Sequence, residues 1–365
     1  MLERFRWTCI LSTKREAMQF NQSIQIASKT IDTHSSVFII AEAGVNHNGS
    51  LELAYQLIDL AISAGADAVK FQQFDSEQLV LDSTEQANYQ KRNLANNQSQ
   101  LEMLKQLELS IDEAKLLQDY CLKSGIVFLT TPFDERSLKQ LDGLNMPAYK
   151  VSSTDLTNIP FLIEIAQKNK PIILSTGMSY LSEIESALEA ILPYNQDVIL
   201  LQCHSDYPTQ DSDVNLNVLR MFQERFNILV GFSDHTPEIG ASPYAIPMGA
   251  KVLEKHFTLD KTLVGPDHSA SLSPEELSEY VAMVRRVELY MGSSIKQPSI
   301  VEQETRKSLQ KCLVARTAIS KGEMFSRENL VAKRTGGEGI SPIYFDSIVG
   351  GYAPKEFQKD EIIGL

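Results

Sequence analysis

Short apolar runs alternate with amphipathic stretches along the chain from residue 37 onward. The apolar runs are typical of strands buried on both faces, whereas the stretches between them carry apolar residues at helical spacing. The runs predict strands at 37–43, 66–74, 126–132, 148–153, 171–176, 197–203, 228–233 and 250–257. The amphipathic stretches predict helices at 51–65, 112–124, 135–141, 160–168, 181–191, 213–225, 238–248 and 273–291.

This alternation predicts an α/β fold with a parallel sheet whose strands are joined by helices. Eight strand–helix units in one run favour a (β/α)8 TIM barrel. A doubly wound open sheet is the alternative. No Gly-x-Gly-x-x-Gly motif follows the first strand, so the dinucleotide-binding version of that sheet is disfavoured.

Two segments depart from the rhythm. Residues 75–111 are polar and rich in Gln and Asn, and they predict a long insertion between the second strand and its helix, on the face where barrels form active sites, with a disordered loop as the alternative. Residues 305–365 hold short strand-like runs broken by Gly and Pro, which predict a small, mostly-β domain. We therefore expect an N-terminal extension over 1–36, a barrel domain over 37–291, a linker over 292–304 and this tail domain.

Charge and cysteine content narrow the class of protein. The formal net charge of −13 disfavours a nucleic-acid surface, because phosphate backbones need a basic patch. No apolar run approaches the roughly 18 residues that would span a bilayer. Residues 1–17 do not resemble a signal peptide, and Met18 is a candidate start. A reducing, cytoplasmic compartment is expected from four widely spaced cysteines, Cys9, Cys121, Cys203 and Cys312.

Barrel enzymes place functional side chains at the carboxyl ends of their strands. The second and fourth predicted strands contribute Lys70 and Lys150, and hydroxyl groups are added by Ser153, Ser175 and Ser233. Two cations among neutral donors suit a phosphate and a carboxylate. The alternative for each lysine is a structural ion pair with a carboxylate.

Two of the six histidines end neighbouring strands. His235 follows the seventh strand and His256 ends the eighth, beside Asp234 and Glu254. Two imidazoles with open positions for water and substrate suit Mn²⁺, Fe²⁺, Co²⁺ or Zn²⁺, and hydrogen-bonded structural histidines are the alternative. Glu42, at the end of the first strand, neighbours the eighth when the barrel closes, and it is placed to orient a substrate hydroxyl or a metal-bound water.

Eight motifs along the barrel are more specific than these residues alone. They read "AEAGVNHNGS", "AVKFQQF", "TTPFD", "YKVSSTDLTN", "ILSTGM", "GFSDHT", "GAKVLEKHFTLDK" and "GPDHSASL". In this order they resemble the sialic acid synthase family, whose members condense phosphoenolpyruvate with an N-acetylated hexosamine. The tail, "LVARTAISKGEMFSRENLVAKRTGGEGISP", resembles the antifreeze-like (SAF) domain of the same enzymes.

The resemblance implies roles for residues that match the family's motifs. His235 and His256 would hold a divalent cation, most often Mn²⁺ with Mg²⁺ or Co²⁺ as alternatives, and Glu42 would lie near the sugar aldehyde. Phosphoenolpyruvate contacts would come from Lys70, Thr131, Lys150, Ser153, Ser175 and Ser233. The aminosugar site would include Gln72, Tyr207 and Asp267.

The resemblance also implies an assembly. Arg334 matches an arginine that reaches the partner subunit's active site, so a domain-swapped homodimer is expected. One stretch, "CHSDYPT", departs from the family pattern, because His204 replaces a common threonine and Ser205 replaces a phosphate-contacting asparagine of some members.

Three rival activities differ in what they require. A 3-deoxy sugar acid synthase would share the barrel without the tail domain. A non-catalytic carbohydrate-binding protein would release no phosphate from phosphoenolpyruvate. A metal-dependent hydrolase on the same barrel would not need phosphoenolpyruvate. Within the sialic acid synthase family, whose products are nonulosonic acids, two acceptors are open. N-acetylmannosamine gives N-acetylneuraminate, whereas a 2,4-diacetamido-trideoxyhexose gives legionaminate or pseudaminate.

Overall fold

The computed structural model describes residues 18–94 and 98–364. The chain divides between Gly292 and Ser293 into two compact units. The segment 1–17, with Cys9, lies outside the described residues. Within the described ranges, no helix combines the length and the apolar character needed to cross a membrane.

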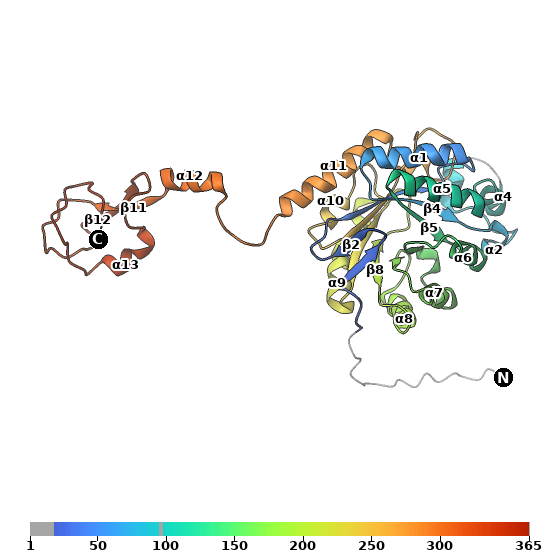
Figure 1. Ribbon diagram of the computed structural model, residues 1–365, viewed down its shortest axis with the longest axis horizontal. Helices are drawn as coiled ribbons and strands as arrows, with labels where there is room; N and C mark the ends of the chain where they lie inside the picture. Colours follow the sequence, from blue (N-terminus) through green and yellow to red (C-terminus); the bar gives the residue numbers. More distant parts are fainter. Residues whose placement is uncertain (1–17, 95–97, 365) are drawn as a thin grey trace. The chain divides into compact units, whose positions relative to one another are not determined.

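Eight parallel strands form the barrel of the first unit (Figure 1). Their order is β5-β4-β3-β10-β9-β8-β7-β6, and β5 and β6 lie close together, so the sheet is nearly closed. This confirms the predicted TIM-like barrel. The strands are β3 (Phe38–Gly44), β4 (Ala68–Gln73), β5 (Val127–Pro132), β6 (Tyr149–Val151), β7 (Ile172–Ser175), β8 (Val198–Cys203), β9 (Leu229–Asp234) and β10 (Val252–His256).

Helices follow the strands and cover the outside of the barrel (Figure 1). The α-helices are α1 (Leu51–Ala64), α5 (Ile111–Ser124), α6 (Glu135–Asp142), α7 (Ile159–Ala166), α8 (Leu181–Ile191), α9 (Asn217–Phe226), α10 (Ser242–Ala245) and α11 (Pro274–Met291). Short 3₁₀ turns lie at η1 (Ser153–Asp155), η2 (Asp211–Asp213) and η3 (His268–Ala270).

Helix α1 shows how the sequence sets these boundaries. The Ser50 side chain accepts a hydrogen bond from the Leu53 N–H and caps the first turn. Gly65 ends the helix in a left-handed conformation at φ 81°. The face between them buries Ala54, Leu57, Ile58 and Ala61, which is the periodicity that predicted the helix.

Apolar side chains fill the interior of the barrel at its amino end. At the start of each strand, alternate side chains point into the barrel. These inward side chains form one apolar cluster. A hairpin of β1 (Ser23–Ile26) and β2 (Lys29–Asp32) adds Ile24, Ile26 and Ile31 to the same cluster. The predicted N-terminal extension therefore contains a hairpin that closes the amino end of the barrel.

One helix prediction on the first unit was wrong. The helix predicted over 238–248 reduces to α10, because Glu238 and Gly240 have positive φ angles that interrupt a helix. The segment 75–111 lies between β4 and α5, as predicted for an insertion, and it contains three short helices. These helices are α2 (Ser76–Leu79), α3 (Asn88–Leu94) and α4 (Gln100–Lys105).

The second unit is small and has its own core. An antiparallel pair, β11 (Lys311–Ala315) and β12 (Leu330–Arg334), is joined by bridges to later segments. Helix α12 (Ile300–Leu309) precedes the pair, and η4 (Pro342–Tyr344) and α13 (Phe345–Ile348) follow it. The core includes Leu313, Ala315, Ile319, Phe325, Leu330, Ile348, Ala353, Phe357 and Ile363.

Candidate active site

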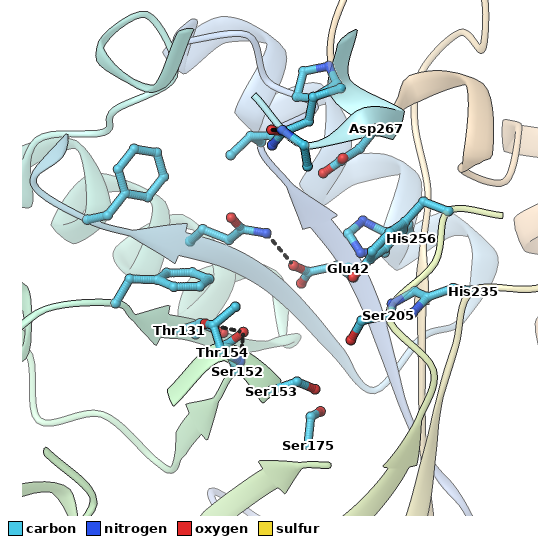
Figure 2. A pocket seen from close by; sticks show the side chains of 18 of the residues that line it. Glu42, Thr131, Ser152, Ser153, Thr154, Ser175, Ser205, His235, His256 and Asp267 are labelled. Carbon is cyan, nitrogen blue, oxygen red and sulfur yellow. Dashed lines mark hydrogen bonds between the residues drawn. The ribbon is translucent and has the colours of Figure 1, made fainter. Parts of the chain in front are cut away.

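A cavity of about 770 Å³ opens at the carboxyl ends of the barrel strands. This volume lies within the range of small-molecule sites. Figure 2 shows labelled side chains that converge on it from different parts of the rim, among them Glu42, Ser175, His235 and His256. The cavity is therefore where a barrel of this class places its chemistry.

Strand alternation decides which side chains reach the cavity. In β10, Val252 joins the interior apolar cluster, Glu254 lies two residues further along, and His256 follows two residues later. Lys70 and Gln72 have the same spacing in β4. Because alternate residues share one face of a strand, each inward row passes from an apolar base to charged and polar groups.

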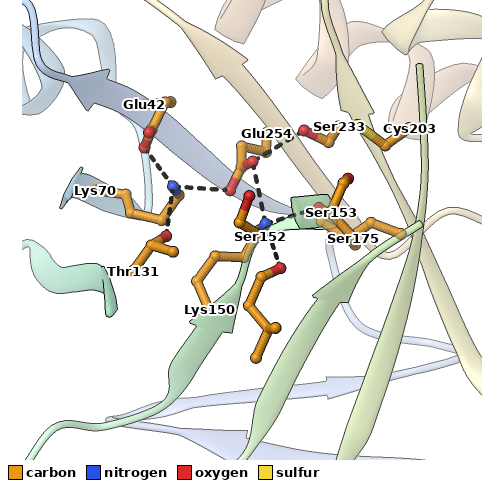
Figure 3. A network of polar contacts seen from close by, with 12 residues as sticks. Glu42, Lys70, Thr131, Lys150, Ser152, Ser153, Ser175, Cys203, Ser233 and Glu254 are labelled. Atoms are coloured by element: carbon orange, nitrogen blue, oxygen red, sulfur yellow. Dashed lines mark hydrogen bonds and ion pairs between the residues drawn. The ribbon is translucent and has the colours of Figure 1, made fainter. Parts of the chain in front are cut away.

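Lys70 lies at the centre of a buried polar network on the cavity floor (Figure 3). Its Nζ is 2.7 Å from Glu42 Oε2 and 3.6 Å from Glu254 Oε2. It also donates to Thr131 Oγ1 at 3.2 Å. Burial alone lowers the pKa of Lys70, but the Glu254 and Glu42 carboxylates raise it on balance, so Lys70 is a fixed cation.

Lys150 forms the second half of this network. Its Nζ donates to Ser175 Oγ at 2.7 Å and lies 3.7 Å from Glu254 Oε1. Glu254 Oε1 also accepts from Ser233 Oγ at 2.9 Å. Figure 3 shows Glu254 between the two lysines, so one carboxylate is shared by both cations.

Glu42 differs from Glu254 in its ionisation. Burial raises the pKa of Glu42 to about 7, against the opposing effect of the Lys70 ammonium. Burial also disfavours the Glu254 anion, but Lys150 and Lys70 together lower the pKa of Glu254. A carboxyl group that titrates near neutrality is suited to proton transfer at working pH.

His235 and His256 face each other on neighbouring strands. Their ring centroids are 5.4 Å apart, and the Tyr207 ring lies 4.2 Å from His235 and 5.8 Å from His256. His235 Nδ1 is 2.8 Å from the His204 carbonyl oxygen. Because a carbonyl oxygen can only accept, Nδ1 carries a proton, and in the neutral form of the ring Nε2 keeps the lone pair.

These two histidines fit a divalent cation. The Nδ1 atom of His256 is buried and has no hydrogen-bond partner among the described residues, and a buried ring nitrogen without a partner is costly. The carbonyl partner of His235 matches the outer contact that metal-binding histidines usually have. No cluster of three or more histidine, cysteine or acidic residues of metal-site geometry occurs in the described ranges. Further ligands would thus come from water or substrate.

Asp267 enters the cavity from the segment after β10 and is 8% exposed. Burial raises the pKa of Asp267 to about 6, and a positive His235 would lower it. Gln72 Nε2 donates to Glu42 Oε1 at 3.3 Å. Figure 2 shows Asp267 on the same side of the cavity as His256. Polar groups therefore lie around Glu42, the candidate for proton transfer.

Gly44 shows how closely the backbone approaches this site. It lies at a register shift between β3 and β4, with φ of +54°. An added Cβ would come within 3.3 Å of Gln72 Nε2 and 3.4 Å of both Glu42 Oε1 and His256 Cε1. Both the left-handed conformation and the crowding therefore favour glycine.

The sequence-predicted site residues of the barrel all line the cavity. They are Glu42, Lys70, Gln72, Thr131, Lys150, Ser153, Ser175, Tyr207, Ser233, His235, His256 and Asp267. Arg334 is an exposed residue of the second unit, at the end of β12.

Two other barrel histidines, His47 and His268, have structural partners. His47 Nδ1 accepts from the Gly49 N–H at 3.0 Å, and burial lowers the pKa of His47 to about 4. His268 lies 2.7 Å from Thr258 Oγ1 and 3.1 Å from Asn48 Oδ1, which ties the loops after β3 and β10 together.

Glu254 belongs to the buried polar network but was not among the predicted site residues. The signal was its position two residues before His256, which puts both side chains on the inner face of β10. The apolar lining from the 75–111 segment was missed as well, because a segment rich in Gln and Asn gave no reason to expect a buried face.

Comparison with protein families matches two models. Residues 57–296 match the NeuB family and residues 310–364 match the SAF domain. N,N'-diacetyllegionaminic acid synthase of Campylobacter jejuni is 44% identical over 89% of this chain and 98% of that protein. Human N-acetylneuraminate-9-phosphate synthase is 37% identical over 89% of this chain and 91% of that protein.

The fold has solved relatives. One is the N-acetylneuraminic acid (sialic acid) synthetase of Leptospira borgpetersenii, solved in complex with citrate. It superposes with a TM-score of 0.69 at 34% sequence identity, and the match covers 80% of this chain and 98% of the synthetase chain. A 3-deoxy-D-arabino-heptulosonate 7-phosphate synthase of Thermotoga maritima has a TM-score of 0.58 at 15% identity over 76% of this chain and 95% of that one. That second likeness extends to the fold alone.

Proposed function

The chain belongs to the NeuB family and carries a SAF domain, and from that premise we propose that it is a nonulosonic acid synthase. The reaction joins phosphoenolpyruvate to the aldehyde of an N-acetylated hexosamine and releases inorganic phosphate. The acceptor class covers N-acetylmannosamine and the 2,4-diacetamido hexoses. Relatives named as N,N'-diacetyllegionaminic and pseudaminic acid synthases support this class.

One observation carries the proposal. Two buried lysines, Lys70 and Lys150, lie on the cavity floor among hydroxyl groups, below the pair His235 and His256. Buried cations with neutral donors suit the carboxylate and phosphate of phosphoenolpyruvate. The histidine pair lies where the sugar aldehyde would meet that anion.

In the proposed reaction, C3 of phosphoenolpyruvate forms a bond to the aldehyde carbon, and its double-bond electrons move to the new bond. Water adds to C2, and the C2–O bond then breaks to release phosphate. A divalent cation held by His235 and His256, with Mn²⁺ as our first choice, would polarise the aldehyde as a Lewis acid.

The chain's own groups position the reactants. Lys70 and Lys150, with Ser175 and Thr131, would hold the anion, and fixed geometry of this kind lowers a bimolecular barrier by several kcal/mol. Glu42 would exchange a proton with the aldehyde oxygen or the attacking water, since its pKa of about 7 allows both forms.

Phosphate release from phosphoenolpyruvate tests the proposal. The purified protein would be assayed with Mn²⁺ and N-acetylmannosamine or a 2,4-diacetamido hexose, with and without EDTA. Acceptor-dependent release that EDTA abolishes is expected. Release without any acceptor would point to a hydrolase, and no release with either acceptor would contradict the proposed reaction.

A further inference from the structure

One wall of the cavity is apolar although it stands above a charged floor. Phe74 lies two residues beyond Gln72 in the inward row of β4, and Phe133 lies two residues beyond Thr131 in that of β5. Their rings pack edge to face, with centroids 6.3 Å apart. Val45, after β3, joins the same wall. The strands that carry the anion-binding candidates therefore continue into apolar side chains.

The 75–111 segment completes this wall. Its residues Leu79, Val80, Met103, Leu104 and Leu107 line the cavity. We call these five, with Val45, Phe74 and Phe133, the apolar lobe. Helix α4 is fixed by a capping box between Ser99 and Glu102.

Most of the described charged side chains of this segment are exposed to solvent. Lys105, at the end of α4, pairs with Glu77 at 2.8 Å, and both side chains are exposed. The mostly polar segment thus directs five of its apolar side chains to the cavity, where an apolar ligand group would cover them.

Among the side chains that the structure describes, none gives the lobe a counter-charge for an anion. Among the lining residues that the structure describes, the only cationic side chains besides the two histidines are Lys70 and Lys150. Both are paired with carboxylates on the floor. The nearest polar side chains from the segment are the amides Gln90 and Gln100, which contact each other at 3.4 Å. A phosphate placed in the lobe would lose water without an ionic partner.

We propose that the apolar lobe receives the distal end of the acceptor and selects a 2,4-diacetamido-2,4,6-trideoxyhexose. This inference rests on the proposed function. With phosphoenolpyruvate on the lysines and the aldehyde at the histidines, the far carbons of the sugar extend toward the rim. Such an acceptor presents a C6 methyl and an acetamido methyl there, whereas N-acetylmannosamine presents hydroxyl groups and its 6-phosphate presents a dianion.

The size of the preference follows from the chemistry of the wall. An apolar pocket discriminates against an added hydroxyl by no more than about 100-fold. We therefore expect kcat/KM for the trideoxy acceptor to exceed that for N-acetylmannosamine by roughly 10- to 100-fold. The 6-phosphate should be the poorest of the three, because its charge has no partner in the lobe.

The wild-type protein with Mn²⁺ and saturating phosphoenolpyruvate provides the first test. Phosphate release would be measured with 2,4-diacetamido-2,4,6-trideoxymannose, N-acetylmannosamine and N-acetylmannosamine 6-phosphate. We expect kcat/KM to decrease from the first of these acceptors to the third. Equal or faster turnover of N-acetylmannosamine or its phosphate would overturn the acceptor inference and leave the proposed function intact. No release with any of the three would overturn both.

Variants of the lobe provide the second test. Leu104→Gln and Leu79→Gln each replace a partly buried leucine of the lobe with a polar side chain of similar size. Leu122→Gln, on α5 and 78% exposed, is the matched control. Both lobe variants should reduce the acceptor preference about tenfold at an unchanged KM for phosphoenolpyruvate, and the control should keep the wild-type ratio. A folded lobe variant with an unchanged ratio would overturn the inference.

Discussion

The ammonium of Lys70 lies 2.7 Å from the carboxylate of Glu42, and both side chains are buried. The cation proposed for the substrate anion is therefore already paired in this structure. An incoming anion competes with Glu42 for Lys70, so binding of the first substrate and the ionisation of Glu42 are coupled. The floor holds two lysines and two glutamates, which leaves little net positive charge before the anion arrives.

Glu42→Gln separates these two effects. The substitution removes a negative charge beside Lys70, so phosphoenolpyruvate should bind several-fold more tightly. Turnover should fall by about 10²- to 10⁴-fold, because the proton-transfer group is lost. Calorimetric titration with phosphoenolpyruvate and an assay of phosphate release measure the two quantities. Glu52→Gln on the exposed side of α1 is the control, and unchanged binding in Glu42→Gln would contradict the competition.

The histidine pair predicts metal dependence. His235→Ala and His256→Ala should each abolish metal-dependent phosphate release and weaken Mn²⁺ binding, with the fold retained. Binding would be followed by electron paramagnetic resonance of free Mn²⁺, and the fold by circular dichroism. His34→Ala, at an exposed position before the barrel, should behave as wild type. Wild-type turnover in either cavity variant would refute the metal assignment.

The sequence predicted the barrel well because its strands are buried on both faces and its helices are amphipathic. Such patterns can be recognised from the spacing of apolar residues along the chain alone. The β1–β2 hairpin was missed, since Ile24, Ile26 and Ile31 form too short an alternation to stand out before packing. Glu254 was seen at a strand end but not assigned. Its role appears only when barrel closure brings Lys70 and Lys150 to either side of it.

The position of the 75–111 insertion was predicted, but its three short helices were not. Its composition is that of a loop, and local propensity favours no long helix. Capping at Ser99 and apolar contacts of Met103 and Leu107 with Phe74 on the barrel rim stabilise short helices there. Such tertiary contacts override composition, and they are invisible to a local reading of the chain.

We expect the buried carboxylate of Asp267 to lower the stability of the folded protein while it contributes to acceptor binding. Burial raises its pKa from 3.8 to about 6 in the folded protein. Because the folded pKa is raised, the favourable contribution of Asp267 is present below pH 3.8 and is lost as the pH rises through 6. A shift of about two units corresponds to roughly 3 kcal/mol at pH 8.

Asp267→Asn should therefore increase the free energy of unfolding at pH 8, by up to about 3 kcal/mol, and the gain should shrink toward pH 4. The KM for the acceptor should rise, because a hydroxyl partner is lost. Urea denaturation of the ligand-free protein from pH 4 to pH 8 measures the first effect. A variant less stable than wild type throughout this range would contradict the assigned cost of the buried carboxylate.

Arg334 predicts that the tail domain serves the active site of a partner subunit. Removal of residues 300–365 and the substitution Arg334→Ala should each abolish turnover. Arg327→Ala, an exposed arginine of the same domain paired with Asp346, should remain active and controls for general loss of charge. A fully active truncation would exclude any role of the tail in catalysis.

Mixed subunits distinguish a swapped tail from one that folds back on its own barrel. Arg334→Ala and Glu42→Gln subunits would be co-expressed with different affinity tags, and doubly tagged dimers purified. In a swapped dimer, one of the two sites combines the intact barrel of the first subunit with the intact arginine of the second. These dimers should then recover about half of the wild-type rate per dimer. Dimers as inactive as the two parents would show that each arginine acts on its own barrel.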